Sequence, residues 1–257
     1  TTAISVLTTL ITASAGSARV AGFDVATQPV EVRRRIALTG QSAAVDDMLT
    51  ATENLVMLGR LSGLSPRAAR GRAAELLERF ALTDAAAKRV KTFSGGMRRR
   101  LDLALSFVVV PEVLFLDEPT TGVDPRSRLD LWEVIRTLAD AGTTVLLTTQ
   151  YLEEADLLAD RVAILNDGRI VETGTPAQLK ALVGSDTVVL HGSDGEPLGE
   201  IPTDGSVGGL RRALDQIDGT DAAASVTLRR PTLDDVFLSL TGSHPARSDA
   251  RTPQEIP

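Results

Sequence analysis

The sequence predicts an α/β fold built on a parallel sheet whose carboxyl edge carries the chemistry. The apolar run Val113-Leu114-Phe115-Leu116 is typical of a buried parallel strand, and Asp117 and Glu118 follow directly at its end. A second buried strand is expected over residues 143–149, ending at Gln150. Because open α/β sheets bind their ligands at the carboxyl ends of strands, we expect a functional site at this edge.

Composition limits the classes of protein that the sequence can encode. The 257 residues, 43% of them hydrophobic, suit one large domain or one with a small appendage. A net charge of −7 argues against a general nucleic-acid binder, and the basic runs at 33–35 and 98–100 are expected to be solvated helix faces. No run approaches the about 18 apolar residues that a membrane-spanning helix needs. Cysteine is absent, which excludes disulfides and thiolate chemistry.

Short strands are expected near the start of the chain. Residues 18–25 form a strand-like stretch that is interrupted at Gly22, and Gln41 falls at the end of a further strand. A neutral amide at that position can contact a metal ion and an attacking water without changing their charge. A plain polar loop residue is the alternative interpretation of Gln41.

A helical insert is expected over residues 47–89. Thr50-Ala51-Thr52-Glu53 matches a capping box, and Ser65-Pro66 suits an N-cap with proline at the first helical position. Both starts precede apolar residues at helical spacing, so each is expected to open a helix with one buried face.

Two further helices begin with N-cap signals. Ser94 suits the N-cap of a helix expected over residues 97–109, and Gly95 and Gly96 let backbone N–H groups approach an anion at its N-terminus. A plain capped helix is the alternative for this Ser-Gly-Gly segment. Asp124-Pro125 is expected to cap the next helix, whose apolar face comprises Leu131, Trp132, Ile135 and Leu138.

A hairpin and a small accessory domain are expected in the second half. Residues 161–173 suit a hairpin with its turn at 166–168, and a short helix is expected after Thr175-Pro176. In the accessory domain, residues 185–241, the expected elements are strands at 187–191 and 224–229 and a helix at 207–217. The isolated His191 and His244 are expected at the surface rather than as metal ligands. Residues 242–257 are expected to be a disordered tail.

The adjacent carboxylates Asp117 and Glu118 favour nucleotide chemistry. Leaving a strand, they point in different directions, so one can hold a metal's hydration shell while the other faces an attacking water. An ordinary strand-to-turn exit is the alternative, and taken alone it is the commoner one. A Ser-Gly-Gly helix, an apolar strand ending in Asp-Glu-Pro and then Gly-x-Asp-Pro agree in order and spacing, which favours the functional interpretation.

These segments resemble the ATP-binding subunits of ABC transporters. Residues 93–97 resemble the ABC signature, residues 114–119 the Walker B strand and residues 121–124 the D-loop. The daunorubicin-resistance type of drug-exporter ATPase is the subgroup that the sequence resembles most. That likeness is carried by three segments: 95–103, 149–156 and the C-terminal Leu-Asp-Asp-Val-Phe-Leu-Ser-Leu-Thr at 233–241.

The resemblance implies a P-loop NTPase-like ABC ATPase core over residues 1–184, with a helical subdomain at about 47–110. Residues 1–7 resemble the segment that follows the lysine of a P-loop and opens its helix. The glycines and the lysine of that loop do not precede Thr1 in the printed sequence, which is the largest departure from the family pattern. Residues 1–257 alone are therefore expected to bind ATP poorly and to be inactive.

The resemblance also assigns roles to individual residues. ATP with Mg²⁺ is the implied cofactor pair, and Mg²⁺ would be held by Thr1, Gln41 and Asp117. Glu118 would polarise the hydrolytic water, and Gln150, where most ABC ATPases have histidine, would bind the γ-phosphate without a proton relay. The remaining nucleotide contacts would be Thr2 and, from the second subunit of a head-to-tail homodimer, Ser94, Gly95 and Gly96; Asp124 would couple the two sites.

An exporter ATPase is the function that the resemblance implies. The chain would drive efflux of drugs or other hydrophobic compounds through a separate ABC membrane-spanning permease subunit, and residues 42–61 are the candidate contact with that permease. The start of the chain carries no secretory signal, so a peripheral position on the cytoplasmic face of the cell membrane is expected. The alternatives are an ABC-type ATPase acting in DNA repair or translation and a degenerate regulatory subunit that dimerises without hydrolysis.

Overall fold

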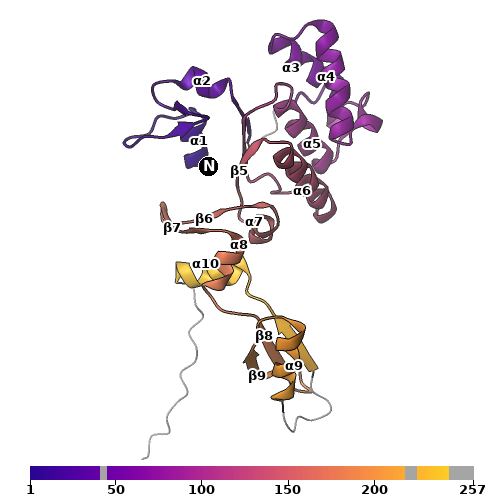
Figure 1. Ribbon diagram of the computed structural model, residues 1–257. Coiled ribbons are helices and arrows are strands. Elements are labelled where there is room, and N and C mark those ends of the chain that lie inside the picture. The colour runs from indigo at the N-terminus through magenta and orange to yellow at the C-terminus, as the bar shows by residue number, and fades with distance from the viewer. Residues whose placement is uncertain (41–44, 218–224, 243–257) are drawn as a thin grey trace, which may run out of the picture. The chain divides into compact units, whose positions relative to one another are not determined.

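The computed structural model describes residues 1–40, 45–217 and 225–242 (Figure 1). Gln41, which was expected at a strand end, and the first residues of the candidate permease contact therefore lie outside the described residues, as do His244 and 243–257. The chain divides into two compact units, Thr1–Tyr151 and Leu152–Pro257, which are considered separately below. No helix in the described ranges has both the length and the apolar character needed to cross a membrane.

A parallel sheet in the order β3-β4-β5 organises the first unit. Its strands are β3 (Ile36–Thr39), β4 (Val113–Asp117) and β5 (Thr144–Thr148). The expected parallel strand at 113–116 is confirmed, and Leu114, Phe115 and Leu116 are almost fully buried. Thr39 lies opposite Leu116, and Asp117 opposite Thr148, so the carboxyl ends of the three strands meet at one edge.

The prediction of a buried strand at 143–149 is wrong in one respect. β5 forms as expected, but the side chain of Leu146 is 37% exposed and Thr144 is exposed as well. Among the described strands β5 pairs only with β4, so its other edge has no strand beside it here. An apolar run does not show whether a strand is paired on one side or on both, which explains the difference.

A small layer formed by the first residues covers part of the sheet. It comprises α1 (Thr2–Leu7), β1 (Arg19–Val20), β2 (Phe23–Asp24) and α2 (Pro29–Arg33). Ile4, Val20 and Val32 pack with Phe115 of β4 in one hydrophobic cluster. β1 and β2 are antiparallel around Ala21 and Gly22, both at positive φ, which confirms the expected interruption at Gly22.

The helical insert between β3 and β4 is confirmed with shorter helices than expected. It contains α3 (Ala51–Leu61), α4 (Pro66–Arg79), the 3₁₀ turns η1 (Thr83–Ala85) and η2 (Val90–Thr92), and α5 (Gly95–Ser106). The Thr50–Glu53 capping box and the Ser65 N-cap are both formed. The two helices expected from these caps are separate, and Gly63 and Ala81, both at positive φ, follow the ends of α3 and α4. Helix α5 ends at Ser106 rather than at residue 109.

Helices α5 and α6 (Pro125–Asp140) approach each other closely near their N-termini. A Cβ atom added to Gly96 would lie 2.4 Å from both Cβ and Oγ of Ser127. The predicted cap of α6 is confirmed, since Asp124 Oδ1 accepts a hydrogen bond from the backbone N–H of Ser127 at 3.0 Å. The apolar face of α6 is buried as expected at Leu131, Trp132, Ile135 and Leu138. Gly96 therefore fixes the distance between the two helix starts.

A hydrophobic cluster in the second unit contains elements from its first residues and from near its C-terminal end in the sequence. It contains residues of α7 (Leu152–Leu158), β6 (Val162–Asn166), α8 (Pro176–Ala181) and α10 (Leu233–Thr241). β6 and β7 (Arg169–Gly174) form the expected hairpin, whose turn places Asp167 and Gly168 at positive φ. The Thr175 capping box of α8 is formed as well. The chain thus returns to this cluster through α10, a helix that the sequence analysis did not predict.

An antiparallel sheet in the order β10-β8-β9 lies between α8 and α10 in the sequence. Its strands are β8 (Thr187–His191), β9 (Pro197–Pro202) and β10 (Ser225–Arg229), with α9 (Val207–Asp215) packed near β8. The expected strands at both ends and the helix are confirmed. β9 was not predicted, because its two prolines and Gly199 are typical of loops rather than strands. The predicted domain boundaries at 184 and 241 stay predictions.

The close approach of α5 and α6 predicts that alanine destabilises the protein at Gly96 but not at the neighbouring Gly95. Because the clash at Gly96 involves a Cβ atom rather than the end of a flexible side chain, Gly96→Ala should lower the free energy of unfolding by about 1–3 kcal/mol. Gly95→Ala is the matched control: no atom lies within 4 Å of its added Cβ, and alanine favours the helix. Urea-induced unfolding measures both variants. Equal stability of the two would contradict the close packing.

Candidate functional site

Asp117 ends β4 as a buried carboxylate with several polar neighbours. Thr148 Oγ1 donates a hydrogen bond to Asp117 Oδ1 at 2.7 Å, and the side chain of Thr1 also contacts this carboxylate. Burial alone would raise the pKa of Asp117, but hydrogen bonds to its carboxylate from the side chains of Thr148 and Thr1 lower it, and the pKa lies below its ordinary value. Asp117 is therefore held ionised at the end of the sheet.

Glu118 occupies an unusual backbone conformation next to Asp117. Its φ is +48°, in the left-handed region that side-chain-bearing residues rarely adopt. Its backbone N–H donates to the carbonyl oxygen of Thr148 at 3.0 Å, which continues the pairing of β4 with β5 by one residue. Strained backbone of this kind is concentrated at functional sites.

The carboxylate of Glu118 contacts Gln150, which lies two residues after the end of β5. Gln150 Nε2 donates to Glu118 Oε2 at 3.3 Å, and Thr121 Oγ1 donates to the same oxygen at 3.0 Å. Gln150 is exposed and Glu118 is half-buried, so the pair faces solvent. The arrangement presents an anionic acceptor beside a neutral amide, which suits the binding and polarisation of a water molecule.

Four further predicted site residues lie at two neighbouring helix N-termini: Ser94, Gly95 and Gly96 at the start of α5 and Asp124 at the start of α6. Ser94 and Gly95 are exposed, and Ser94 Oγ accepts a hydrogen bond from the backbone N–H of Met97 at 3.2 Å. Asp124 caps α6, whose start packs against Gly96 through Ser127. The structure therefore brings together Thr1, Asp117, Glu118 and Gln150 in one group, and Ser94–Gly96 with Asp124 in another. Thr2 is the first residue of α1.

Sequence reasoning missed Thr148 and Thr121, which bind the two carboxylates directly. Both are threonines close to the ends of predicted strands or turns, and nothing in their local sequence distinguishes them from ordinary strand and turn residues. Only the register of β4 against β5 places Thr148 opposite Asp117. A contact between two particular strand residues can be identified only when the pairing of the strands is known, and a local sequence pattern does not give that pairing.

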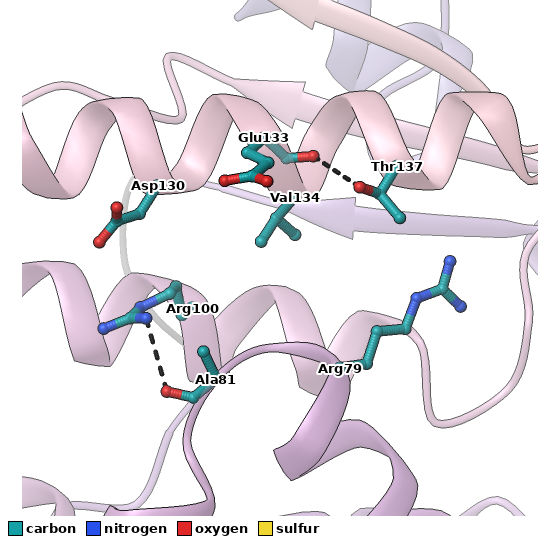
Figure 2. Close-up of a pocket in the computed structure, with 7 residues that line it drawn as sticks. All are labelled: Arg79, Ala81, Arg100, Asp130, Glu133, Val134 and Thr137. Carbon is teal, nitrogen blue, oxygen red and sulfur yellow. Dashed lines mark hydrogen bonds between the residues drawn. The ribbon is translucent and has the colours of Figure 1, made fainter.

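A pocket of about 350 Å³ lies among the helices and does not coincide with this site (Figure 2). Arg100 lies across it from Asp130 of α6, Arg79 lies nearer Thr137 at the other end, and Glu133 of α6 also lines it. The remaining lining residues are Ala81, Val134 and Thr137. None of the predicted site residues lines the pocket, so the candidate site is the strand-end group rather than this cavity.

Comparisons with known proteins agree with this geometry. Residues 1–121, which include α5 and β4 with Asp117 and Glu118, match the family described as ABC transporter. The daunorubicin/doxorubicin resistance ATP-binding protein DrrA of Streptomyces peucetius is 49% identical over 277 residues, covering 99% of this chain and 83% of the relative. The chain belongs to the ABC transporter family of ATP-binding proteins.

The resemblance of this ABC protein to the daunorubicin-resistance subgroup is also confirmed. The daunorubicin resistance ATP-binding protein DrrA2 of Streptomyces coeruleorubidus is 50% identical over 275 residues, covering 98% of this chain and 85% of the relative. A solved structure, described as a dimeric post-hydrolysis state of the ATP-binding cassette MJ0796 bound to ADP and Pi, has a TM-score of 0.59. It is 21% identical and covers 68% of this chain and 79% of its own, which confirms the ABC ATPase fold.

The positive φ of Glu118 predicts that glycine at this position gives a more stable protein than alanine, the reverse of the usual order. A side-chain-bearing residue in the left-handed region costs about 1–2 kcal/mol, more than the about 0.4–1 kcal/mol by which glycine's freedom favours the unfolded chain. Glu118→Gly should therefore be more stable than Glu118→Ala by roughly 0.5–1 kcal/mol. Urea-induced unfolding at neutral pH compares the two. An alanine variant as stable as the glycine variant would show that the turn carries no strain.

The cap of α6 predicts a pH dependence of stability. Backbone and side-chain hydrogen bonds from Ser127 hold the pKa of Asp124 below its ordinary value of 3.8. The stability that the ionised cap contributes is therefore present above pH 3.8 and is lost as the pH falls through the lowered pKa. Thermal unfolding of wild type and Asp124→Asn should differ most near neutral pH and converge in strong acid. A difference that is constant over this range would contradict the role of the charge.

Proposed function

We propose that the chain is the ATP-binding and ATP-hydrolysing subunit of an ABC exporter that drives efflux of drugs or other hydrophobic compounds. Membership of the ABC family supports the use of ATP, and the names of the relatives, which refer to daunorubicin and doxorubicin resistance, support export of such compounds. The compounds would cross the membrane through a separate permease subunit. This chain would supply the energy.

The contact between Glu118 and Gln150 is the observation that carries the proposal. Glu118 presents a carboxylate that Thr121 and Gln150 orient from two sides, and a carboxylate in this setting can polarise a water molecule for attack on a γ-phosphate. Gln150 binds through a neutral amide and cannot take up a proton near neutral pH, so no histidine-like relay operates here. Glu118 is thus the residue that acts on the water.

The oxygen donors next to Glu118 fit Mg²⁺. This ion prefers oxygen ligands and keeps several of its waters, so it needs few protein groups. Asp117 is ionised and lies next to Thr1, and both side chains offer oxygen atoms; Gln41 would complete the predicted set. No group of three or more histidine or acidic side chains suited to a metal occurs in the ranges that the structure describes. Bound Mg²⁺ would neutralise charge on the phosphates.

A head-to-tail homodimer would complete the site. The N-terminus of α5 exposes Ser94 and Gly95, and backbone N–H groups at a helix start attract anions. In the dimer, this helix start would contact the γ-phosphate of ATP held by the other copy, and Asp124 beside it would couple the two sites. Each nucleotide would then be bound by both copies, so neither copy is competent alone.

The permease contact is proposed for the described part of residues 42–61. Three large apolar side chains there are exposed to solvent: Met48 at 59%, Met57 at 42% and Leu61 at 77%. Such side chains favour a protein partner when they gather on one surface. The chain would bind the permease peripherally, on the cytoplasmic face of the membrane, and its net charge of −7 supports no role in nucleic-acid binding.

Replacement of Glu118 tests the proposed function. In the full-length protein, Glu118→Gln should lower Mg²⁺-dependent ATP turnover by about 10²–10⁴-fold, because an amide cannot polarise the water, while ATP binding and dimer closure persist. Glu133→Gln, the same change at an exposed position on α6, is the matched control and should retain wild-type turnover. Steady-state hydrolysis and size-exclusion chromatography with ATP measure both effects.

Turnover of Glu118→Gln close to wild type would remove Glu118 from the mechanism. Absence of ATPase activity in the wild-type protein, even with its permease present, would instead favour a regulatory subunit that dimerises without hydrolysis.

A further inference from the structure

Arg99 lies in α5, just after the exposed N-terminus, and is almost fully buried at 9% exposure. Its Nε donates a hydrogen bond to the carbonyl oxygen of Pro119 at 2.8 Å, and its Nη1 donates to the carbonyl oxygen of Gly40 at 2.6 Å. The same Nη1 lies 3.2 Å from Asp102 Oδ2 in an ion pair one helical turn away. The expectation that residues 98–100 form a solvated face is therefore wrong for Arg99.

The two carbonyl groups mark the ends of adjacent strands. Gly40 directly follows β3, and Pro119 directly follows Glu118 beyond β4. One guanidinium group thus joins α5 to both strand ends. Only arginine supplies several N–H donors in one rigid plane, whereas lysine has a single ammonium group on a flexible stem. The ion pair with Asp102 offsets the cost of burying the charge.

The contact of Arg99 with Pro119 holds the strained turn one residue after Glu118. Glu118 is at positive φ, and such a conformation persists only where its surroundings fix it. Before the turn, the N–H of Glu118 is bound to the carbonyl of Thr148 in β5; after it, the carbonyl of Pro119 is bound to Arg99. Two hydrogen bonds, one before the turn and one after it, therefore hold the backbone from which the Glu118 side chain extends.

We propose that Arg99 is a positioning residue for ATP hydrolysis: it fixes the turn that aims Glu118 and ties that turn to α5. This inference rests on the proposed function, because it concerns the carboxylate that would polarise the water. Arg99 touches neither nucleotide nor water in this role. Arg99 acts through Glu118. It joins two parts of the same copy: α5, which would contact the γ-phosphate of ATP bound by the other copy, and the Glu118 carboxylate, which would act on the ATP bound by its own copy.

The neighbouring arginines serve as internal comparisons. Arg98 pairs with Asp47 at 2.5 Å on the surface. Arg100 contacts the carbonyl oxygen of Ala81 at 3.5 Å and faces the pocket between the helices (Figure 2). Neither contact involves a strand end. Among the three consecutive arginines, the positioning role therefore belongs to Arg99.

A double-mutant cycle between Arg99 and Glu118 tests the inference in the full-length protein. Arg99→Lys keeps the charge beside Asp102 but cannot bridge both carbonyls, so the single-turnover rate of ATP hydrolysis should fall by about 10²-fold, as expected when a reacting group is misplaced. The affinity for ATP should change little. In the Glu118→Gln background the same substitution should change the residual rate only slightly, because no carboxylate remains to be aimed.

Two control variants separate positioning from stability. Arg100→Lys makes the same change one residue away and should leave the rate unaltered. Asp102→Asn weakens the ion pair yet keeps both carbonyl contacts of Arg99, so it should lower the melting temperature more than the rate. If Arg99→Lys does not fold, Arg99→Gln combined with Asp102→Asn removes the buried charges together and takes its place in the cycle.

Equal fold-losses from Arg99→Lys in the wild-type and Glu118→Gln backgrounds would overturn the positioning role, since a merely structural residue acts independently of Glu118. A wild-type protein without Mg²⁺-dependent hydrolysis would instead overturn the proposed function, and this inference with it. The two failures are thus distinguished by the wild-type rate.

Discussion

The register of β4 against β5 is the constraint on which the candidate site depends. It places Asp117 opposite Thr148, and the next residue, Glu118, continues the pairing through its backbone N–H before the chain turns. Successive side chains of a strand point to opposite faces, so a shift by one residue would exchange the positions of the two carboxylates. Leu114, Phe115 and Leu116, which precede the two carboxylates, are buried and hold β4 in the core of this unit.

Helix α5 is bound to the same edge of the sheet, and α6 packs against α5. Arg99 of α5 binds the carbonyl groups that follow β3 and β4, and α6 is held against the start of α5 by the contact between Gly96 and Ser127. The exposed helix start at Ser94 is therefore linked through buried polar contacts to the strained turn at Glu118. In an ABC ATPase that binds nucleotide between two copies, such links would make closure of the dimer and alignment of Glu118 one event.

Signals that lie within a few residues were predictable from the sequence, and long-range contacts were not. The caps at Thr50, Ser65 and Asp124 and the apolar strand at β4 depend on local chemistry, so their patterns were sufficient. The contact between Thr148 and Asp117 depends on register, and Arg99 resembles its neighbours in sequence while differing from them in burial. β9 escaped detection because its composition is that of a loop and cross-strand pairing alone makes it a strand.

The position of the nucleotide can be determined from a structure of the full-length protein with Mg²⁺ and a non-hydrolysable ATP analogue. We expect Mg²⁺ bound by Thr1 and Gln41, with Asp117 in contact directly or through one water. We also expect the γ-phosphate near Gln150 and the Ser94–Gly96 helix start of a second copy, with a water within hydrogen-bond distance of Glu118. A nucleotide bound away from the ends of β4 and β5, or a Glu118 carboxylate turned from the γ-phosphate, would contradict this arrangement.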